Sequence, residues 1–179
     1  MGFIDDIDVI VKEVDARWPG RPMVAVGISM GGHALARYVG VKGERCQLRA
    51  AVCISAGYSI VEGFRVLATQ PLSNRILNSR FQDVIRHHRQ LFEKLNFPKL
   101  NVTHLLNAKT ILDFDREFTV KMCGWRTAEE YQEVASASSV LPAVRIPLLC
   151  LNALDDSMVD LASLSHAIFA ARHNEWVVR

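Results

Sequence analysis

The chain has 179 residues, the length of one domain, so it predicts a single core and excludes two domains of ordinary size. Apolar residues make up 50% of the sequence and charged residues 22%, which is typical of a folded globular protein and not of a disordered or fibrous one. Lysine and arginine number 21 against 19 aspartate and glutamate, and the formal charge of +2 argues against nucleic acid as the main partner.

The cysteines predict a reducing compartment, because they are widely spaced and form no CxxC pair. They are Cys46, Cys53, Cys123 and Cys150. We therefore expect free thiols, no zinc or other metal site, and a protein that is cytoplasmic or associated with the cytosolic side of a membrane. The acidic N-terminal stretch carries no signal-peptide pattern. Apolar runs such as 146–151 fall far short of the ~20 residues that span a bilayer.

The N-terminal part predicts a helix, a strand and a second helix. Apolar residues recur every three or four positions over 3–18, which indicates an amphipathic helix. After a Pro-Gly break, the continuous apolar run at 23–28 is typical of a parallel strand covered on both faces. A helix follows from about 30 to 39, and we expect Gly40 to terminate it.

Two further buried strands are predicted at 48–56 and 147–153, and a segment of different composition lies between them. Residues 59–110 contain eight lysines and arginines against three acidic residues. We interpret residues 59–125 as a basic, helical lid inserted over a sheet. Its candidate helices cover 61–67, 72–77 and 81–95.

The remaining elements complete an α/β pattern. Thr127 with Glu130 three residues later is a capping-box pattern that starts a helix over 127–135. The tail predicts a last helix over 160–174 and a last strand over 175–179. Alternating strands and helices indicate an α/β fold with a mostly parallel sheet flanked by helices.

The most informative segment is the GxSxG pattern of Gly27, Ser29 and Gly31, between the first strand and the second helix. A turn of this kind strains the serine backbone, and the residues two before and two after must lack bulk. The turn lifts the Ser29 hydroxyl above the sheet, and the N–H of Met30 can donate to a developing oxyanion. The pattern predicts an acyl-transfer nucleophile, and a purely structural serine is the alternative.

A nucleophilic serine needs a histidine base and a carboxylate that orients it, in the chain order Ser, Asp or Glu, His for this fold. Asp155 and Asp156 follow an apolar strand, at the carboxyl end of the sheet where open α/β folds bind ligands. Either aspartate could be the acid. The alternative is a solvated pair that starts the next helix.

None of the six histidines is well placed as the base. His33 lies one turn beyond Ser29, and we expect it to pack or to contact the lid. His173 is near a helix C-terminus, where a cation suits the helix dipole. The other four, which offer no better position, are His87, His88, His104 and His166. The base is therefore expected beyond Arg179.

The chain resembles the AB hydrolase-4 family of α/β-hydrolases over nearly its whole length, and the resemblance depends on four segments. They are VAVGISMGGHALARYVG at 24–40, AVCISAGYS at 51–59, ILDFDREFTVKMCGW at 111–125 and EEYQEVASASSVLPAVRIPLLCLNALDDSMVD at 129–160. The resemblance implies an α/β-hydrolase fold with a helical lid, Ser29 as the nucleophile and no cofactor. It implies Asp156 as the acid, because the family's loop has Asp, two residues, an aliphatic residue and Pro, although Asp160 replaces that Pro here. Asp155 is the alternative.

Two parts of the family pattern are absent: the early strands with the second oxyanion donor, and the Gly-Gly-His loop. Residues 1–179 are therefore expected to form one partial domain, incomplete at both ends. The predicted function is a serine hydrolase or acyltransferase for a fatty acyl ester, with Ser29 forming the acyl-enzyme. The alternative is a noncatalytic or truncated protein of hydrolase fold. The basic lid suggests peripheral membrane contact, and the oligomeric state stays open.

Overall fold

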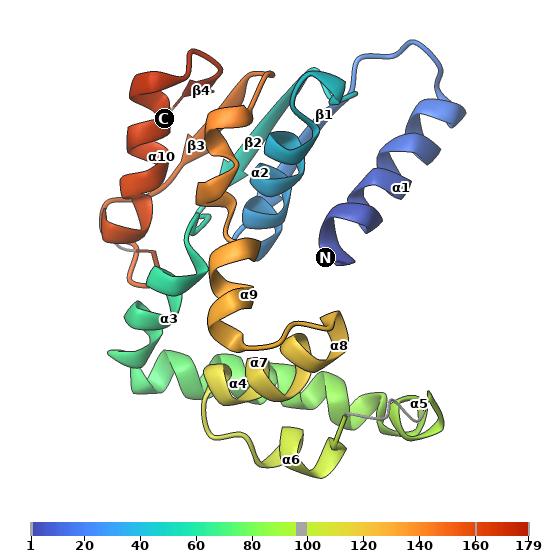
Figure 1. Ribbon diagram of the computed structural model, residues 1–179, viewed down its shortest axis with the longest axis vertical. Coiled ribbons are helices and arrows are strands. Elements are labelled where there is room, and N and C mark those ends of the chain that lie inside the picture. Colours follow the sequence, from blue (N-terminus) through green and yellow to red (C-terminus); the bar gives the residue numbers. More distant parts are fainter. Residues whose placement is uncertain (1, 96–99, 160, 179) are drawn as a thin grey trace. The chain divides into compact units, whose positions relative to one another are not determined.

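The computed structural model describes residues 2–95, 100–159 and 161–178. Its elements in chain order are α1 (Gly2–Arg17), β1 (Val24–Ile28), α2 (Met30–Lys42), η1 (Gly43–Arg45), β2 (Ala50–Ile54), α3 (Ile60–Ala68), α4 (Pro71–His87), α5 (Arg89–Leu95), α6 (Val102–Asn107), α7 (Ile111–Asp115), η2 (Arg116–Val120), α8 (Lys121–Cys123), α9 (Ala128–Ala135), η3 (Ala137–Ser139), η4 (Leu141–Ala143), β3 (Leu148–Leu151), α10 (Leu161–His173) and β4 (Val177–Val178) (Figure 1). Asp160 and Arg179, at the ends of the predicted last helix and last strand, lie outside the described residues.

The described residues form two compact units. Unit 1 comprises residues 1–63 and 133–179, and unit 2 comprises residues 64–132. The chain leaves unit 1 within α3 and returns to it within α9. Unit 2 overlaps the predicted lid (59–125), whose role as a lid stays a prediction.

A parallel sheet is the centre of unit 1, as the alternating pattern predicts. Among the described residues it has four strands in the order β1-β2-β3-β4, and every neighbouring pair is parallel. Gly27 pairs with Cys53, and Cys53 pairs with Cys150. Because all strands run the same way, the loops that follow β1, β2 and β3 meet at one edge of the sheet.

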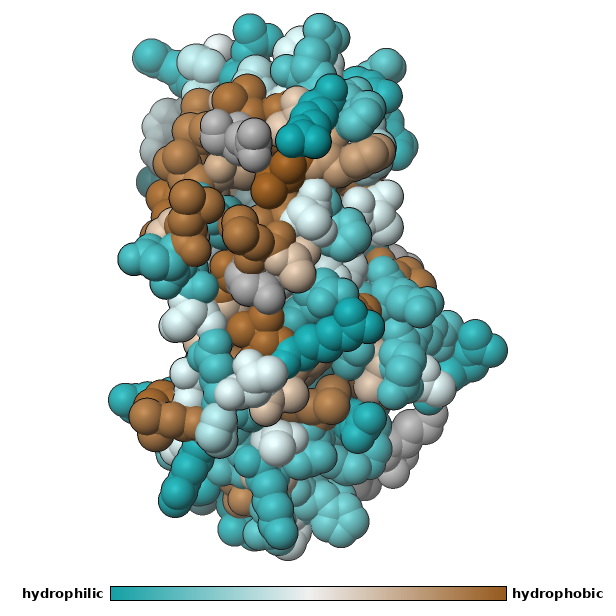
Figure 2. Space-filling view, turned by 90° about the vertical axis from the view of Figure 1, so that its left-hand side faces the viewer, coloured by the Kyte–Doolittle hydropathy of each residue, from teal (hydrophilic) through white to brown (hydrophobic). Residues whose placement is uncertain are grey.

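Among the described residues, one face of this sheet is covered by helices, and the other is open at strand β1. Residues of α2 and α10 share a core with the covered face, where Ala51, Cys53 and Leu148 are fully or almost fully buried. On the opposite face Val24, Val26 and Ile28 of the edge strand β1 are each more than 60% exposed. Figure 2 shows apolar residues gathered on one side of unit 1, in the upper part of the view.

The end of α2 corrects one prediction. The helix continues past Gly40 to Lys42, and Gly43 ends it, with φ 50° and its N–H donating to the carbonyl oxygen of Val39. Gly40 is needed for packing instead, because a Cβ there would lie 2.5 Å from the carbonyl oxygen of Val140. The predicted termination was therefore wrong by three residues.

Unit 2 is helical, as predicted, but its helices divide differently. A single helix, α4, spans the predicted gap between 77 and 81, and the break falls at His88. Ile85, Leu105 and Phe114 form the buried core of this unit. No helix among the described residues is long and apolar enough to cross a membrane.

The start of α9 matches half of the predicted capping box. The Thr127 hydroxyl accepts from the N–H of Glu130 at 3.1 Å. The Glu130 carboxylate turns back to Arg126, whose backbone N–H and guanidinium both donate to it. The cap therefore begins the helix where the sequence predicts. The Glu130 carboxylate, however, accepts from Arg126, which precedes the N-cap residue Thr127.

Candidate active site

Ser29 occupies the turn between β1 and α2 in a strained backbone conformation, with φ 53° and ψ −121°. Its N–H donates to the carbonyl oxygen of Ile54 at 2.8 Å, which extends the pairing of β1 with β2 by one residue. Its carbonyl oxygen accepts from the N–H of His33 at 3.1 Å, the first bond of α2. Hydrogen bonds on both sides therefore stabilise a conformation that a non-glycine residue rarely adopts.

The strained turn leaves the Ser29 side chain accessible. The residue is exposed, and its hydroxyl makes no hydrogen bond to any residue that the structure describes. A serine held in this way above the end of a strand can present its oxygen to a substrate carbonyl. The geometry is that expected for the nucleophile.

Close approach of β1 and α2 explains the glycines, with one correction. A Cβ on Gly27 would lie 2.5 Å from the carbonyl oxygen of Gly31, so this position must lack a side chain. The expectation that Gly31 must also lack bulk is wrong, since a Cβ there would have no described heavy atom within 4 Å. The second tight position is Gly32, where a Cβ would lie 2.8 Å from that of Ala56. The adjacent pair Gly31-Gly32 was the feature of the sequence that could have identified Gly32 as a position without room for a side chain.

Met30 is placed as an oxyanion donor would be. It is the first residue of α2, and the N–H groups at a helix start have no acceptor within the helix. The partial positive charge of the helix N-terminus adds to the attraction for a negative oxygen. This N–H follows the Ser29 hydroxyl directly in the chain, so both groups can face the same carbonyl carbon.

The two candidate acids, Asp155 and Asp156, differ in their surroundings. Asp156 is half-buried, and its Oδ1 accepts from the N–H of Met158 at 2.8 Å and of Val159 at 3.3 Å. Asp155 is exposed, with no hydrogen bond to any described residue. Two backbone donors orient the Asp156 carboxylate and leave its second oxygen available. Asp156 therefore has the fixed carboxylate that a histidine partner requires.

Sheet order places the serine and the aspartate at the same edge. Ser29 follows β1 and Asp156 follows β3, with β2 between them. Two strand spacings of about 4.8 Å separate the ends of β1 and β3, which leaves room for one imidazole between the side chains. The loops after β2 and β3 are joined directly, because the Asn152 amide donates to the carbonyl oxygen of Ala56 at 3.1 Å.

None of the histidines in unit 1 bridges these two groups. The ring nitrogens of His33 both face backbone carbonyls, as described below. His173 lies at the C-terminal end of α10, where its Nδ1 is 2.8 Å from the carbonyl oxygen of Phe169. His166 is exposed on α10. The structure therefore brings Ser29 and Asp156 to one edge of the sheet, and no histidine of unit 1 lies between them.

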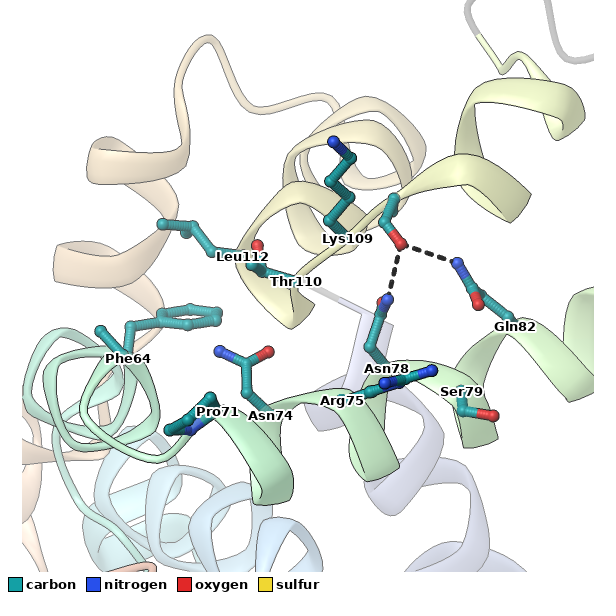
Figure 3. A pocket seen from close by; sticks show the side chains of 12 residues that line it. Phe64, Pro71, Asn74, Arg75, Asn78, Ser79, Gln82, Lys109, Thr110 and Leu112 are labelled. Carbon is teal, nitrogen blue, oxygen red and sulfur yellow. Dashed lines mark hydrogen bonds between the residues drawn. The ribbon is translucent and has the colours of Figure 1, made fainter.

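A separate pocket of about 740 Å³ lies within unit 2 (Figure 3). Three amides one turn apart on α4 stabilise its wall: Asn74, Asn78 and Gln82. Asn78 and Gln82 both donate to the carbonyl oxygen of Ala108, at 2.7 and 2.9 Å. None of the predicted site residues lines this pocket.

Comparison with known proteins points to one family. The Hydrolase_4 family model, described as serine aminopeptidase, S33, matches residues 1–175. The phospholipase ABHD3 of Bos taurus is 35% identical over 167 residues, which cover 92% of this chain and 39% of the relative. The monoacylglycerol lipase of Saccharomyces cerevisiae is 28% identical over 163 residues, which cover 88% of this chain and 36% of the relative.

A solved esterase from Pyrococcus furiosus shares the fold, with a TM-score of 0.51 and 15% identity over 98% of this chain and 49% of the esterase. The chain thus spans about two fifths of the length of the curated relatives described above and about half of the esterase.

Proposed function

Since the chain belongs to the Hydrolase_4 (serine aminopeptidase, S33) family of α/β-hydrolases, we propose that it carries the nucleophile and the acid of a serine hydrolase for fatty acyl esters. The observation that carries the proposal is the strained, accessible Ser29 at the start of α2, with Met30 next to it. The lipid substrate class is supported by the names of two relatives, a phospholipase and a monoacylglycerol lipase.

The proposed chemistry proceeds through an acyl-enzyme. The Ser29 oxygen attacks the ester carbonyl carbon, and its proton passes to a histidine. The N–H of Met30 stabilises the negative charge on the carbonyl oxygen. When the intermediate collapses, the histidine returns the proton to the leaving alcohol. Water then attacks the acyl-enzyme by the same route and releases the fatty acid, whereas an alcohol in place of water would give acyl transfer.

The base of this triad is proposed to lie outside the 179 residues, with Asp156 orienting it. The absence of a suitable histidine from unit 1 and the two backbone bonds to Asp156 support this division. The noncatalytic alternative requires that Ser29 be unreactive even when the protein carries every segment that its transcript encodes. That difference makes the two readings separable by one experiment.

The experiment is covalent labelling of the protein, expressed from its full-length transcript, with a fluorophosphonate that carries a medium alkyl chain. We expect mass spectrometry to find the label on Ser29, and Ser29→Ala to abolish it. Ser55→Ala is the matched control, because Ser55 also has a positive φ, 48°, and directly follows strand β2. Absence of label on Ser29 in the unaltered protein would contradict the function.

The acid assignment is tested in the same assay. Asp156→Asn should slow labelling by about 10⁴-fold, the loss known when a triad carboxylate becomes an amide. Asp155→Asn should leave the rate nearly unchanged. If Asp155→Asn abolishes labelling while Asp156→Asn has no effect, the assignment of the acid is wrong.

We also propose that unit 2 acts as the lid and contacts anionic lipid surfaces from the cytosolic side. In the described part of unit 2 four basic side chains have no ion pair: Arg75, Arg80, Lys94 and Lys109. Lysine or arginine near an anionic membrane surface contributes about 1 kcal/mol each. The four cysteines, which are all free, support a reducing compartment.

A further inference from the structure

His33 is held between two backbone carbonyls that are distant in the sequence. Its Nδ1 lies 2.7 Å from the carbonyl oxygen of Gly57, and its Nε2 lies 3.0 Å from that of Ala135. Gly57 belongs to the loop after β2, and Ala135 is the last residue of α9. The side chain starts from the first turn of α2, and the N–H of the same residue bonds to Ser29. One imidazole therefore joins the nucleophile turn to two other segments.

Neighbouring hydrogen bonds connect the same segments. Arg37, one turn after His33, donates to the carbonyl oxygen of Val134 at 2.6 Å. The hydroxyl of Ser136 accepts from the N–H of Ile60 at 2.9 Å. In addition, the N–H of Ser138 donates to the carbonyl oxygen of Tyr58 at 2.8 Å. The stretch that leads toward unit 2 (57–60) and the stretch that returns from it (134–138) are thus bonded to each other and to α2.

The protonation state of the His33 imidazole determines how many of these hydrogen bonds it can donate. A neutral imidazole has one N–H, so it donates to one of the two carbonyls, whereas a protonated ring could donate to both. Burial lowers the pKa of His33 and outweighs the two carbonyls, which favour the charged form. A side chain with one donor at a similar reach should therefore preserve part of the contact, and a side chain with none should lose it.

We propose that His33 is a positioning residue for Ser29: it holds residues 57–60 and 134–138 against the first turns of α2 and so fixes the turn that presents the serine. The proposal rests on the proposed function, in which Ser29 is the nucleophile. His33 itself does not exchange a proton with the substrate in this scheme, because carbonyls occupy the surroundings of both ring nitrogens.

Hydrogen exchange of the 179-residue chain tests the structural part. In His33→Ala we expect amides of 29–34, 57–63 and 134–140 to exchange about tenfold faster, because a local opening then costs less. His33→Gln should fall between this variant and the unaltered chain, since its amide can donate to one carbonyl. His173→Ala is the matched control and should change none of these segments. Unaltered exchange in His33→Ala would overturn the proposal.

Labelling of Ser29 tests the functional part, in the protein expressed from its full-length transcript. His33→Ala should slow fluorophosphonate labelling by about 10- to 100-fold at an unchanged folded fraction, the loss expected from a small misplacement of a reacting group. His33→Gln should recover part of the rate, and His173→Ala should label normally. If Ser29 labels normally in His33→Ala, His33 is not a positioning residue. If Ser29 does not label in any form, the proposed function fails and this proposal fails with it.

Discussion

Glycine is required at two positions around Ser29 and dispensable at a third. Gly27 and Gly32 face each other where β1 passes α2, and a Cβ on Gly32 would also lie 3.0 Å from the carbonyl oxygen of Gly27. A Cβ on Gly31 would have no described heavy atom within 4 Å. The GxSxG pattern therefore contains one glycine that the packing needs, and the second lies just outside the pattern.

Substitution by alanine should separate these positions. Gly27→Ala and Gly32→Ala are each expected to lower the free energy of unfolding by about 1–3 kcal/mol, because the new Cβ overlaps atoms of the adjacent element. Gly31→Ala should be neutral or raise it by up to about 1 kcal/mol, since alanine favours a helix more than glycine does. Urea denaturation followed by circular dichroism measures all three. Equal losses at the three positions would contradict the packing described here.

Asp115 in unit 2 carries a buried carboxyl group with one oxygen, Oδ2, that has no hydrogen-bond partner among the described residues. Burial raises the pKa of this group to about 6, against a smaller opposing effect of a hydrogen bond from Thr119. In the unfolded chain the carboxyl ionises near its ordinary value of 3.8. The folded protein thus holds a proton that the unfolded chain releases between these two values.

This difference predicts how stability changes with pH. As pH rises from about 4 to about 6, the contribution of Asp115 to stability is lost, and above that range the buried charge costs about 1–3 kcal/mol. Asp115→Asn should therefore raise the melting temperature at pH 7.5 and have much less effect at pH 4.5. Asp113→Asn, in the capping box with Thr110, is the control and should not stabilise at either pH. A gain for Asp115→Asn that is the same at both pH values would refute the explanation.

At the scale of the elements, the edge strand β1 is notable for its exposed apolar face. Its side chains alternate between the covered face, with Gly27 buried, and the open face, with Val24, Val26 and Ile28 exposed. Parallel strands are normally covered on both faces, and an open apolar edge strand is a site of association between chains. The prediction that this continuous apolar run is covered on both faces is therefore wrong for the described residues, which cover it on one face only.

We therefore expect the 179-residue chain to self-associate as its concentration rises and to bind a hydrophobic dye. The double variant Val24→Thr, Val26→Thr should reduce both effects, since threonine keeps the β-branched shape and lowers the apolar area. Leu72→Ser removes a similarly exposed leucine on α4 and is the control that should change little. Light scattering of fractions from a sizing column measures the association. A chain that stays monomeric at about 100 μM without binding the dye would exclude this surface as a contact.

At the scale of the whole molecule, basic charge accumulates in one of the two units. Several basic side chains of unit 2 are neutralised locally, as in the pairs of Arg86 with Asp83 and Arg89 with Glu93. Arg75, Arg80 and Lys109 have no such partner among the described residues and are exposed. Charges without a local partner add directly to the positive potential of the surface, which attracts an anionic surface.

Vesicle sedimentation should detect this attraction. We expect the protein to bind vesicles with anionic lipid more tightly than neutral ones, and salt to weaken the binding, because exposed charges are screened within about 8 Å at physiological ionic strength. The triple variant Arg75→Gln, Arg80→Gln, Lys109→Gln should lose most of the preference. Arg86→Gln, which removes a paired charge, is the control. Equal partitioning onto neutral and anionic vesicles would leave unit 2 as a solvated helical surface.

The sequence by itself determined the parts of this protein that depend on local spacing. The apolar run before Ser29 and the helical pattern after it predicted the strand, the turn and the helix that the structure has. The two later apolar runs became β2 and β3, because short buried strands have few ways to satisfy their backbone other than pairing with each other. The sequence identified Asp155 and Asp156 as candidate acids for the same reason, since they follow one of these strands closely.

Only the tertiary structure decided the features that depend on residues far apart in the chain. Gly40 packs against the backbone at Val140, and the Asn78 amide of α4 donates to the carbonyl oxygen of Ala108. The two carbonyls around His33 come from residues 24 and 102 positions away. Local spacing in a sequence reports the periodicity of a helix or strand, but contacts at such separations arise only when the elements pack.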